Sequence, residues 1–151
     1  MSTIAVFKKN LKWYFLALIF IANAFAWYAV FRESRNGILV AALDVGQGDA
    51  IFIEVQNGNQ ILIDGGPNKK ILEALGKIMP FYDRKIDALI LTHSHEDHLN
   101  GLIEVLKNYK ISMVLESGTG NGKSYEEFEK IIKERKIPRF FVKRGTKLDM
   151  G

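Results

Sequence analysis

The sequence predicts an α/β domain preceded by one membrane-spanning helix, and two observations carry this prediction. Residues 13–31 form an almost uninterrupted apolar run in which Asn23 is the only strongly polar side chain. From residue 38 onward, short runs rich in Ile, Val and Leu alternate with apolar residues at helical spacing. Because strands come first and helices then alternate with strands, residues 38–151 are expected to form one layered α/β domain.

The composition fits one modest globular domain and limits the types of side chain that could bind a metal ion. Of 151 residues, 48% are hydrophobic and 25% are charged, which excludes a disordered or collagen-like chain. The chain has no cysteine, so a metal site must be built from histidine and carboxylate side chains. Residues 1–36 hold five basic residues and one acidic residue, which accounts for the whole formal net charge of +4. The remainder is neutral, so the overall charge does not indicate a basic domain surface.

The N-terminal region divides into a basic flank at residues 1–12, an apolar run at residues 13–31 and a polar linker at residues 32–37. The run is long enough to cross a bilayer as a helix, and Trp and Tyr lie near both of its ends. The basic flank predicts a cytoplasmic N-terminus and a domain on the extracytoplasmic side. Small residues at 22–26 also fit a signal-peptide cleavage site, and a buried core helix is a further alternative. We favour an uncleaved anchor, because cleavage there would leave an apolar stub.

Six strands and three helices are expected after the linker. The sequence Asn57-Gly58-Asn59 indicates a hairpin turn, and Pro80 is expected to end the first helix. Ser124 and Glu127 offer a capping box for the last helix. The strands are expected at residues 38–45, 50–55, 60–63, 86–91, 111–115 and 139–142, and the helices carry apolar faces at Ile71, Leu72, Leu75, Ile78 and Met79, at Leu99, Leu102, Ile103 and Leu106, and at Phe128, Ile131 and Ile132.

All three histidines of the chain lie within residues 92–98, T-H-S-H-E-D-H, between a predicted strand and a helix expected to begin near Leu99. In an extended turn, His93 and His95 can point to the same side and meet one cation, and Asp97 and His98 can meet a second one beside it. Imidazole and carboxylate are donors that zinc, manganese and iron accept. A solvated turn that happens to be rich in histidine is the alternative.

Two segments together resemble a known family. T-H-S-H-E-D-H-L-N-G resembles the His-x-His-x-Asp-His signature of the metallo-β-lactamase-like hydrolases, and I-L-I-D-G-G at residues 61–66 resembles their preceding Asp-Gly-Gly. L-D-V-G-Q-G-D-A at residues 43–50 resembles the opening of the ComEC-type subgroup, found in DNA-uptake channel proteins and stand-alone relatives. The resemblance covers residues 38–151. It implies a four-layer αββα fold, two bound metal ions and hydrolysis at a phosphoryl or carbonyl centre.

The resemblance also implies roles for individual residues. His93 and His95 are implied as ligands of the first metal, and Asp97 and His98 as ligands of the second, with zinc expected and manganese or iron as alternatives. Asp97 is in addition the candidate catalytic residue. Asp64 is implied as the carboxylate that braces the histidine loop, whereas local turn chemistry alone would make it a plain turn residue. Three further residues could line the cleft or simply form a turn: Asp44, Gln47 and Asp49.

The complete family fold takes further metal ligands from a second half-unit, and no histidine follows His98 here. The resemblance therefore implies about one half-unit, either truncated or assembled with a second half-domain or a second copy. Two functions are expected: a membrane-anchored metallohydrolase acting on phosphodiesters such as DNA, or a non-catalytic tethered half-domain that is an assembly partner or a decayed remnant. The basic stretch at residues 133–147 could bind phosphate, but a solvated face is expected, because Phe140 and Phe141 are predicted to be strand core.

Overall fold

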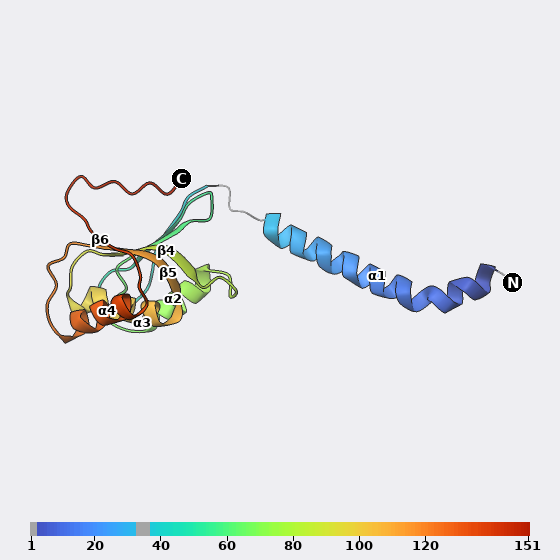
Figure 1. The fold of residues 1–151 in the computed structure, drawn as a ribbon, viewed down its shortest axis with the longest axis horizontal. Helices are drawn as coiled ribbons and strands as arrows, with labels where there is room; N and C mark the ends of the chain where they lie inside the picture. The colour runs from blue at the N-terminus through green and yellow to red at the C-terminus, as the bar shows by residue number, and fades with distance from the viewer. Residues whose placement is uncertain (1–2, 33–36) are drawn as a thin grey trace. The chain divides into compact units, whose positions relative to one another are not determined.

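The computed structural model describes residues 3–32 and 37–151 and divides the chain into two units, Met1–Arg35 and Asn36–Gly151. The first unit contains one long helix, α1 (Thr3–Arg32), shown in Figure 1. Its stretch Leu11–Tyr28 is long and apolar enough to cross a membrane, by length and composition alone. The helix begins well before the predicted apolar run, and most of the predicted linker, residues 32–37, lies outside the described residues.

The second unit is built on a six-stranded sheet whose spatial order is the order of the chain. The first three strands pair antiparallel, and the last three pairings are parallel. A tight turn suffices for the antiparallel part, where Gly58 has a φ of 82° in the predicted hairpin. The strands are β1 (Leu39–Ala42), β2 (Ile51–Glu54), β3 (Gln60–Ile63), β4 (Lys85–Leu91), β5 (Lys110–Glu116) and β6 (Arg139–Phe141).

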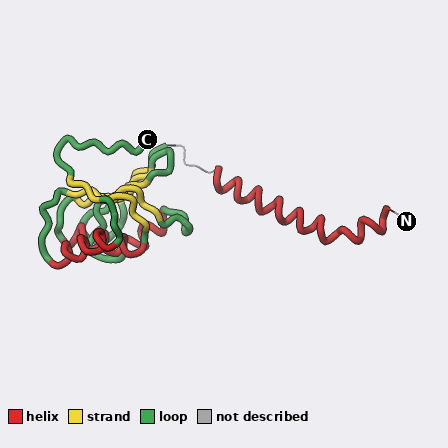
Figure 2. The backbone as a smooth tube through the Cα atoms, in the orientation of Figure 1, coloured by secondary structure: helices red, strands yellow, loops and turns green. Residues whose placement is uncertain are grey.

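Three helices provide the parallel crossovers and cover one face of this sheet: α2 (Lys70–Ile78), α3 (Glu96–Asn108) and α4 (Lys123–Glu134) (Figure 2). Crossovers between parallel strands are almost always right-handed, so successive connections running in one direction along the sheet lie on the same face. The main core fills this helix–sheet interface. Its fully buried side chains include Phe52, Leu62, Leu75, Leu89, Leu102, Leu106 and Phe128.

The opposite face of the sheet is crossed by the C-terminal segment, residues 142–151 (Figure 1). Leu148 and Met150 pack against a small apolar cluster on this face. The side chains of Asn57 and Asn59 donate hydrogen bonds to the carbonyl oxygen of Met150, at 2.6 and 2.8 Å. The segment therefore returns from the edge strand β6 to the β2–β3 turn.

Every predicted strand and helix is present, although β1 ends at Ala42 and not at Val45, and three further details of the prediction are wrong. Helix α3 begins at Glu96, three residues before the expected start, so Asp97 and His98 lie in its first turn. Ser124 does not cap α4, because that helix begins at Lys123 and has no side-chain cap hydrogen bond.

The third error concerns the aromatic pair in β6. Phe140 and Phe141 were expected to be strand core, yet they are 50% and 63% exposed. The reason is the position of β6, which is the last strand of the sheet. An edge strand shares its faces with fewer neighbours than a central strand does.

A buried polar network joins β5, β6 and α4. Glu116 is only 1% exposed, accepts a hydrogen bond from the Tyr125 hydroxyl at 2.6 Å and pairs with Arg139. Arg139 also donates to the Tyr125 oxygen at 2.8 Å and pairs with Glu129 at 2.7 Å. Burial and the hydrogen bond to Glu116 raise the pKa of Tyr125 to about 12. Burial would lower the pKa of Arg139, but hydrogen bonds to Glu116 and Glu129 outweigh it and raise that pKa.

Candidate metal centre

Three sequence motifs that lie far apart in the chain meet at one end of the strands, where β3 and β4 have their carboxyl ends. They are the β1–β2 loop at residues 43–50, the turn at residues 64–66 after β3, and residues 92–98 after β4. The parallel strands β3 and β4 end at the same edge, which brings their following turns together. The backbone N–H of Gly65 donates to the carbonyl of His98 at 2.8 Å, and that of Gly66 donates to Asp49 at 3.1 Å.

Two glycines allow these segments to approach so closely. A Cβ atom on Gly101 would overlap the carbonyl group of Gly65, and a Cβ atom on Gly48 would overlap the carbonyl oxygen of Asp97. Gly48 also has a φ of 71°, a backbone conformation that suits glycine. These glycines let the first turns of α3 rest directly against both neighbouring loops. The packing role of Gly101 was not part of the sequence prediction, although it belongs to the same ten-residue motif.

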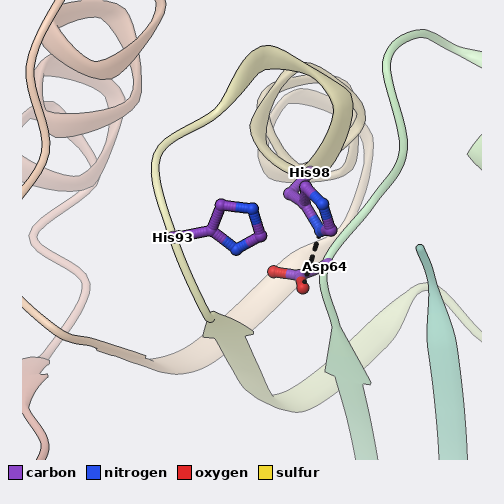
Figure 3. A group of neighbouring side chains, drawn as sticks. All are labelled: Asp64, His93 and His98. Carbon is purple, nitrogen blue, oxygen red and sulfur yellow. Dashed lines mark hydrogen bonds and ion pairs between the residues drawn. The ribbon is translucent and has the colours of Figure 1, made fainter. Parts of the chain in front are cut away.

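Asp64 ties the end of β3 to both ends of the histidine segment. It is 3% exposed and has a φ of 56°, which is uncommon outside glycine. Its Oδ1 accepts a hydrogen bond from the backbone N–H of Thr92 at 2.9 Å. Its Oδ2 accepts from the Thr92 hydroxyl at 2.6 Å and lies 3.0 Å from Nδ1 of His98 (Figure 3). All these partners are distant in sequence, so local turn chemistry does not describe this residue.

The four predicted ligands lie close together in the structure. His93, His95 and Asp97 place ligand atoms within 4.8 Å of one another, and all three residues are exposed. The ring centroid of His93 lies 4.8 Å from that of His95 and 3.8 Å from that of His98. Nε2 of His98 lies 3.7 Å from an Asp97 oxygen. His93 therefore lies between His95 and His98 and is a neighbour of both (Figure 3 shows His93 and His98).

Two groups of side chains in the described residues could hold a cation, and their surroundings differ. Asp64, His93 and His98 also place ligand atoms within 4.8 Å of one another, but both Asp64 oxygens already accept hydrogen bonds. The group formed by His93, His95 and Asp97 is open to solvent. Two imidazoles and a carboxylate fit zinc, manganese or iron. An ion can therefore reach this exposed group without breaking the hydrogen bonds of Asp64.

The predicted cleft residues lie on the loop that borders this exposed group. Asp44, Gln47 and Asp49 are all exposed, and their loop contacts the backbone of Asp97 through Gly48. Oδ1 of Asp44 accepts a hydrogen bond from the backbone N–H of Gly46 at 3.2 Å, which is a turn-stabilising contact. The structure thus places the loop that carries these three residues against the backbone of Asp97 and gives Asp44 a local turn contact.

Comparison with known proteins gives a consistent family match. Residues 43–149 match the family described as the metallo-beta-lactamase superfamily. The chain is 30% identical over 129 residues to ComE operon protein 3 of Bacillus subtilis (strain 168), an alignment that covers 74% of this chain and 17% of that protein. It is 36% identical over 94 residues to Recombination protein 2 of Haemophilus influenzae, covering 59% of this chain and 12% of that protein. The alignments thus span less than a fifth of either relative.

One solved structure that resembles the chain has a lower sequence identity than these relatives. A crystal structure described as a new diphosphatase from the PhnP family superimposes with a TM-score of 0.48 and 17% sequence identity. The superposition covers 76% of this chain and 53% of the other.

Proposed function

The chain belongs to the metallo-beta-lactamase superfamily, and on that premise we propose that it is a membrane-anchored, metal-dependent hydrolase of phosphodiesters. The observation that carries the proposal is the convergence of His93, His95, Asp97 and His98 on one accessible sheet edge. The relative named for recombination supports DNA as the substrate, because recombination is a reaction of DNA. The superfamily binds divalent metal ions, and the donor types present here fit such ions.

For the metal centre, we propose that His93 and His95 hold one ion and that Asp97 and His98 hold a second. Zinc is the expected metal, with manganese or iron as alternatives. A divalent ion bound here supplies Lewis-acid stabilisation of the charge that develops on a phosphoryl group. Asp64 keeps the loop and α3 in register, so that the donor atoms remain together. We propose that the carboxylate of Asp97, whose side chain is 51% exposed, also accepts a proton from an incoming water molecule.

Metal retention tests the ligand assignment. His95→Ala and Asp97→Ala are each expected to weaken zinc or manganese binding by about 100-fold or more, which exceeds the typical effect of an outer hydrogen-bond partner. Glu96→Ala is the matched control, because Glu96 lies between the two proposed ligands yet belongs to neither candidate group. Equal losses in all three variants would instead indicate a loosely chelating turn.

For the anchor, we propose that α1 crosses the membrane uncleaved, with its N-terminus in the cytoplasm and the domain outside. The support is the apolar stretch Leu11–Tyr28 and the basic flank that precedes it. A reporter enzyme fused after Gly151 should be active only outside the cytoplasm, and the protein should remain in the membrane fraction at full length. Recovery of a shorter soluble form beginning near Phe25 would replace the anchor with a signal peptide.

A second candidate function is a non-catalytic tethered module that works with a second half-domain or a second copy. The observation in its favour is the number of donors: among the described residues, the proposed ligands supply two donors to each of two ions. Catalytic zinc sites typically have three protein ligands. Fewer ligands position the reacting groups less well, and a misplacement of about 1 Å can cost on the order of a hundredfold in rate.

One assay separates the two candidates. The purified full chain in detergent is incubated with Zn²⁺ or Mn²⁺ and with bis-p-nitrophenyl phosphate or single-stranded DNA, beside His95→Ala. We expect slow, metal-dependent turnover that His95→Ala abolishes. Turnover equal to that of His95→Ala, together with tight metal binding, would reject the hydrolase and favour the tethered module.

A further inference from the structure

The hydroxyl group of Thr92 lies between the buried carboxylate and the first histidine of the metal-ligand segment. Its Oγ1 is 2.6 Å from Oδ2 of Asp64 and 2.9 Å from Nδ1 of His93. Both distances are those of well-formed hydrogen bonds. Thr92 thus connects Asp64 to His93 through its hydroxyl group.

The number of protons that these three groups can donate sets the direction of each hydrogen bond. An ionised carboxylate only accepts, so the single hydroxyl proton of Thr92 must be donated to Asp64. Thr92 Oγ1 can then only accept from His93, which requires a proton on Nδ1 of that ring. Neutral His93 therefore carries its proton on Nδ1 and leaves the lone pair of Nε2 free.

His98 is held in the same way by a direct contact. Its Nδ1 lies 3.0 Å from Oδ2 of Asp64, which can only accept, so this ring also carries its proton on Nδ1. One oxygen of Asp64 therefore orients two imidazoles: His98 directly and His93 through Thr92. Metal-binding histidines commonly use one ring nitrogen for the ion and the other for an orienting acceptor.

We propose that Thr92 is a positioning residue whose hydroxyl relays Asp64 to His93 and keeps Nε2 of His93 available to a cation. The metal-binding part of this inference rests on the proposed function, whereas the tautomer is a property of the metal-free chain. The hydrogen bond from the backbone N–H of Thr92 to Asp64 would remain after substitution of Thr92 by any residue except proline. The relay, in contrast, needs a hydroxyl group.

Two substitutions separate the hydroxyl from the rest of the side chain. Thr92→Val keeps the branched shape and removes the hydroxyl, whereas Thr92→Ser keeps the hydroxyl and removes the methyl group. Because Thr92 is exposed, neither change should prevent folding. The chain contains only 3 histidines, so selective ¹⁵N-histidine labelling of the full chain in detergent gives few ring signals. His93→Gln identifies the signals of His93.

The first readout is the tautomer of His93 in the metal-free chain, measured by ¹⁵N–¹H correlation at about pH 8.5, where ordinary imidazoles are neutral. We expect Nδ1–H in the native chain and in Thr92→Ser, and a shift toward Nε2–H in Thr92→Val. An unchanged tautomer in Thr92→Val would overturn the proposal. So would a shift of equal size in Thr92→Ser, because the methyl group would then be responsible.

The second readout is Zn²⁺ affinity, measured by competition with a chelator. Thr92→Val should bind about 10–100-fold more weakly, the usual cost of losing an orienting partner, and Thr92→Ser should stay within about threefold of the native chain. Weaker binding without a change of tautomer would overturn the relay. Failure of the hydrolase proposal is recognised separately, by absence of turnover in a native chain whose His93 still shows the Nδ1–H tautomer.

Discussion

Two buried carboxylates occupy similar places in this fold and have different surroundings. Asp64 follows β3 and is 3% exposed, and Glu116 ends β5 and is 1% exposed. Asp64 accepts hydrogen bonds from the backbone N–H and the hydroxyl of Thr92 and contacts Nδ1 of His98, and these partners belong to the metal-ligand segment at residues 92–98. Glu116 binds the cation of Arg139 and the hydroxyl of Tyr125, and these two partners also bond to each other.

The difference shows why burial of a carboxylate does not by itself mark a functional site. In the Glu116 network, the charges and hydrogen bonds are satisfied within the network, so its role is to hold β5, β6 and α4 together. Around Asp64, the orienting bonds use one nitrogen of each imidazole and leave the other available. The comparison predicts that the first network controls stability and that the second controls metal binding.

The largest expected effect is on stability, from Glu116→Ala. Removing the carboxylate leaves the mostly buried Arg139 and Tyr125 without their shared partner, which should lower the free energy of unfolding by about 3–5 kcal/mol. Urea unfolding of the full chain, followed by circular dichroism, measures this loss. Glu129→Ala removes the more exposed partner of the same arginine and should cost at most about 1 kcal/mol. Equal losses in the two variants would contradict the comparison.

The second expected effect is a pH dependence of stability. The folded chain raises the pKa of Tyr125 from 10.0 to about 12, so the native state holds this proton more tightly than the unfolded state. The stabilisation is complete below pH 10 and is lost as the pH rises toward 12. At pH 11 the free energy of unfolding has fallen by about 1.4 kcal/mol from this source. Unfolding measured between pH 9 and pH 11 should therefore show a steeper decline in the native chain than in Tyr125→Phe. Parallel declines would show that the tyrosine proton is not linked to folding.

The third effect separates the two networks most directly. Asp64→Asn keeps the size of the side chain but replaces an acceptor with a donor, so it should weaken Zn²⁺ binding by about 10–100-fold. It should lower the free energy of unfolding by about 1–3 kcal/mol, less than Glu116→Ala. In Glu116→Ala, by comparison, the metal affinity of the folded fraction should be unchanged. Chelator competition on both variants tests this contrast, which fails if they lose affinity to the same extent.

The sequence by itself determined the elements and the local cluster of ligand types. Runs of Ile, Val and Leu, apolar residues at helical spacing and the Asn57-Gly58-Asn59 turn were sufficient to predict that each strand and helix of the domain exists, because these features depend on neighbouring residues. His93, His95, Asp97 and His98 were recognisable for the same reason, since they fall in one short segment. The resemblance to the metallo-β-lactamase-like family rested on the same local motifs and agrees with the family match.

The family resemblance implied Asp64 as the residue that braces this segment, but only the tertiary structure gave the contacts that Asp64 makes and the network around Glu116. Asp64 meets Thr92 and His98 across 28 and 34 residues, and Glu116 meets Arg139 across 23 residues, separations at which composition and periodicity carry no information about contact. The exposure of Phe140 and Phe141 depends on the edge position of β6, which is a property of the assembled sheet. Hydrogen bonds and burial at these sites are set by parallel strand order and helix packing, so they exist only once distant segments have been brought together.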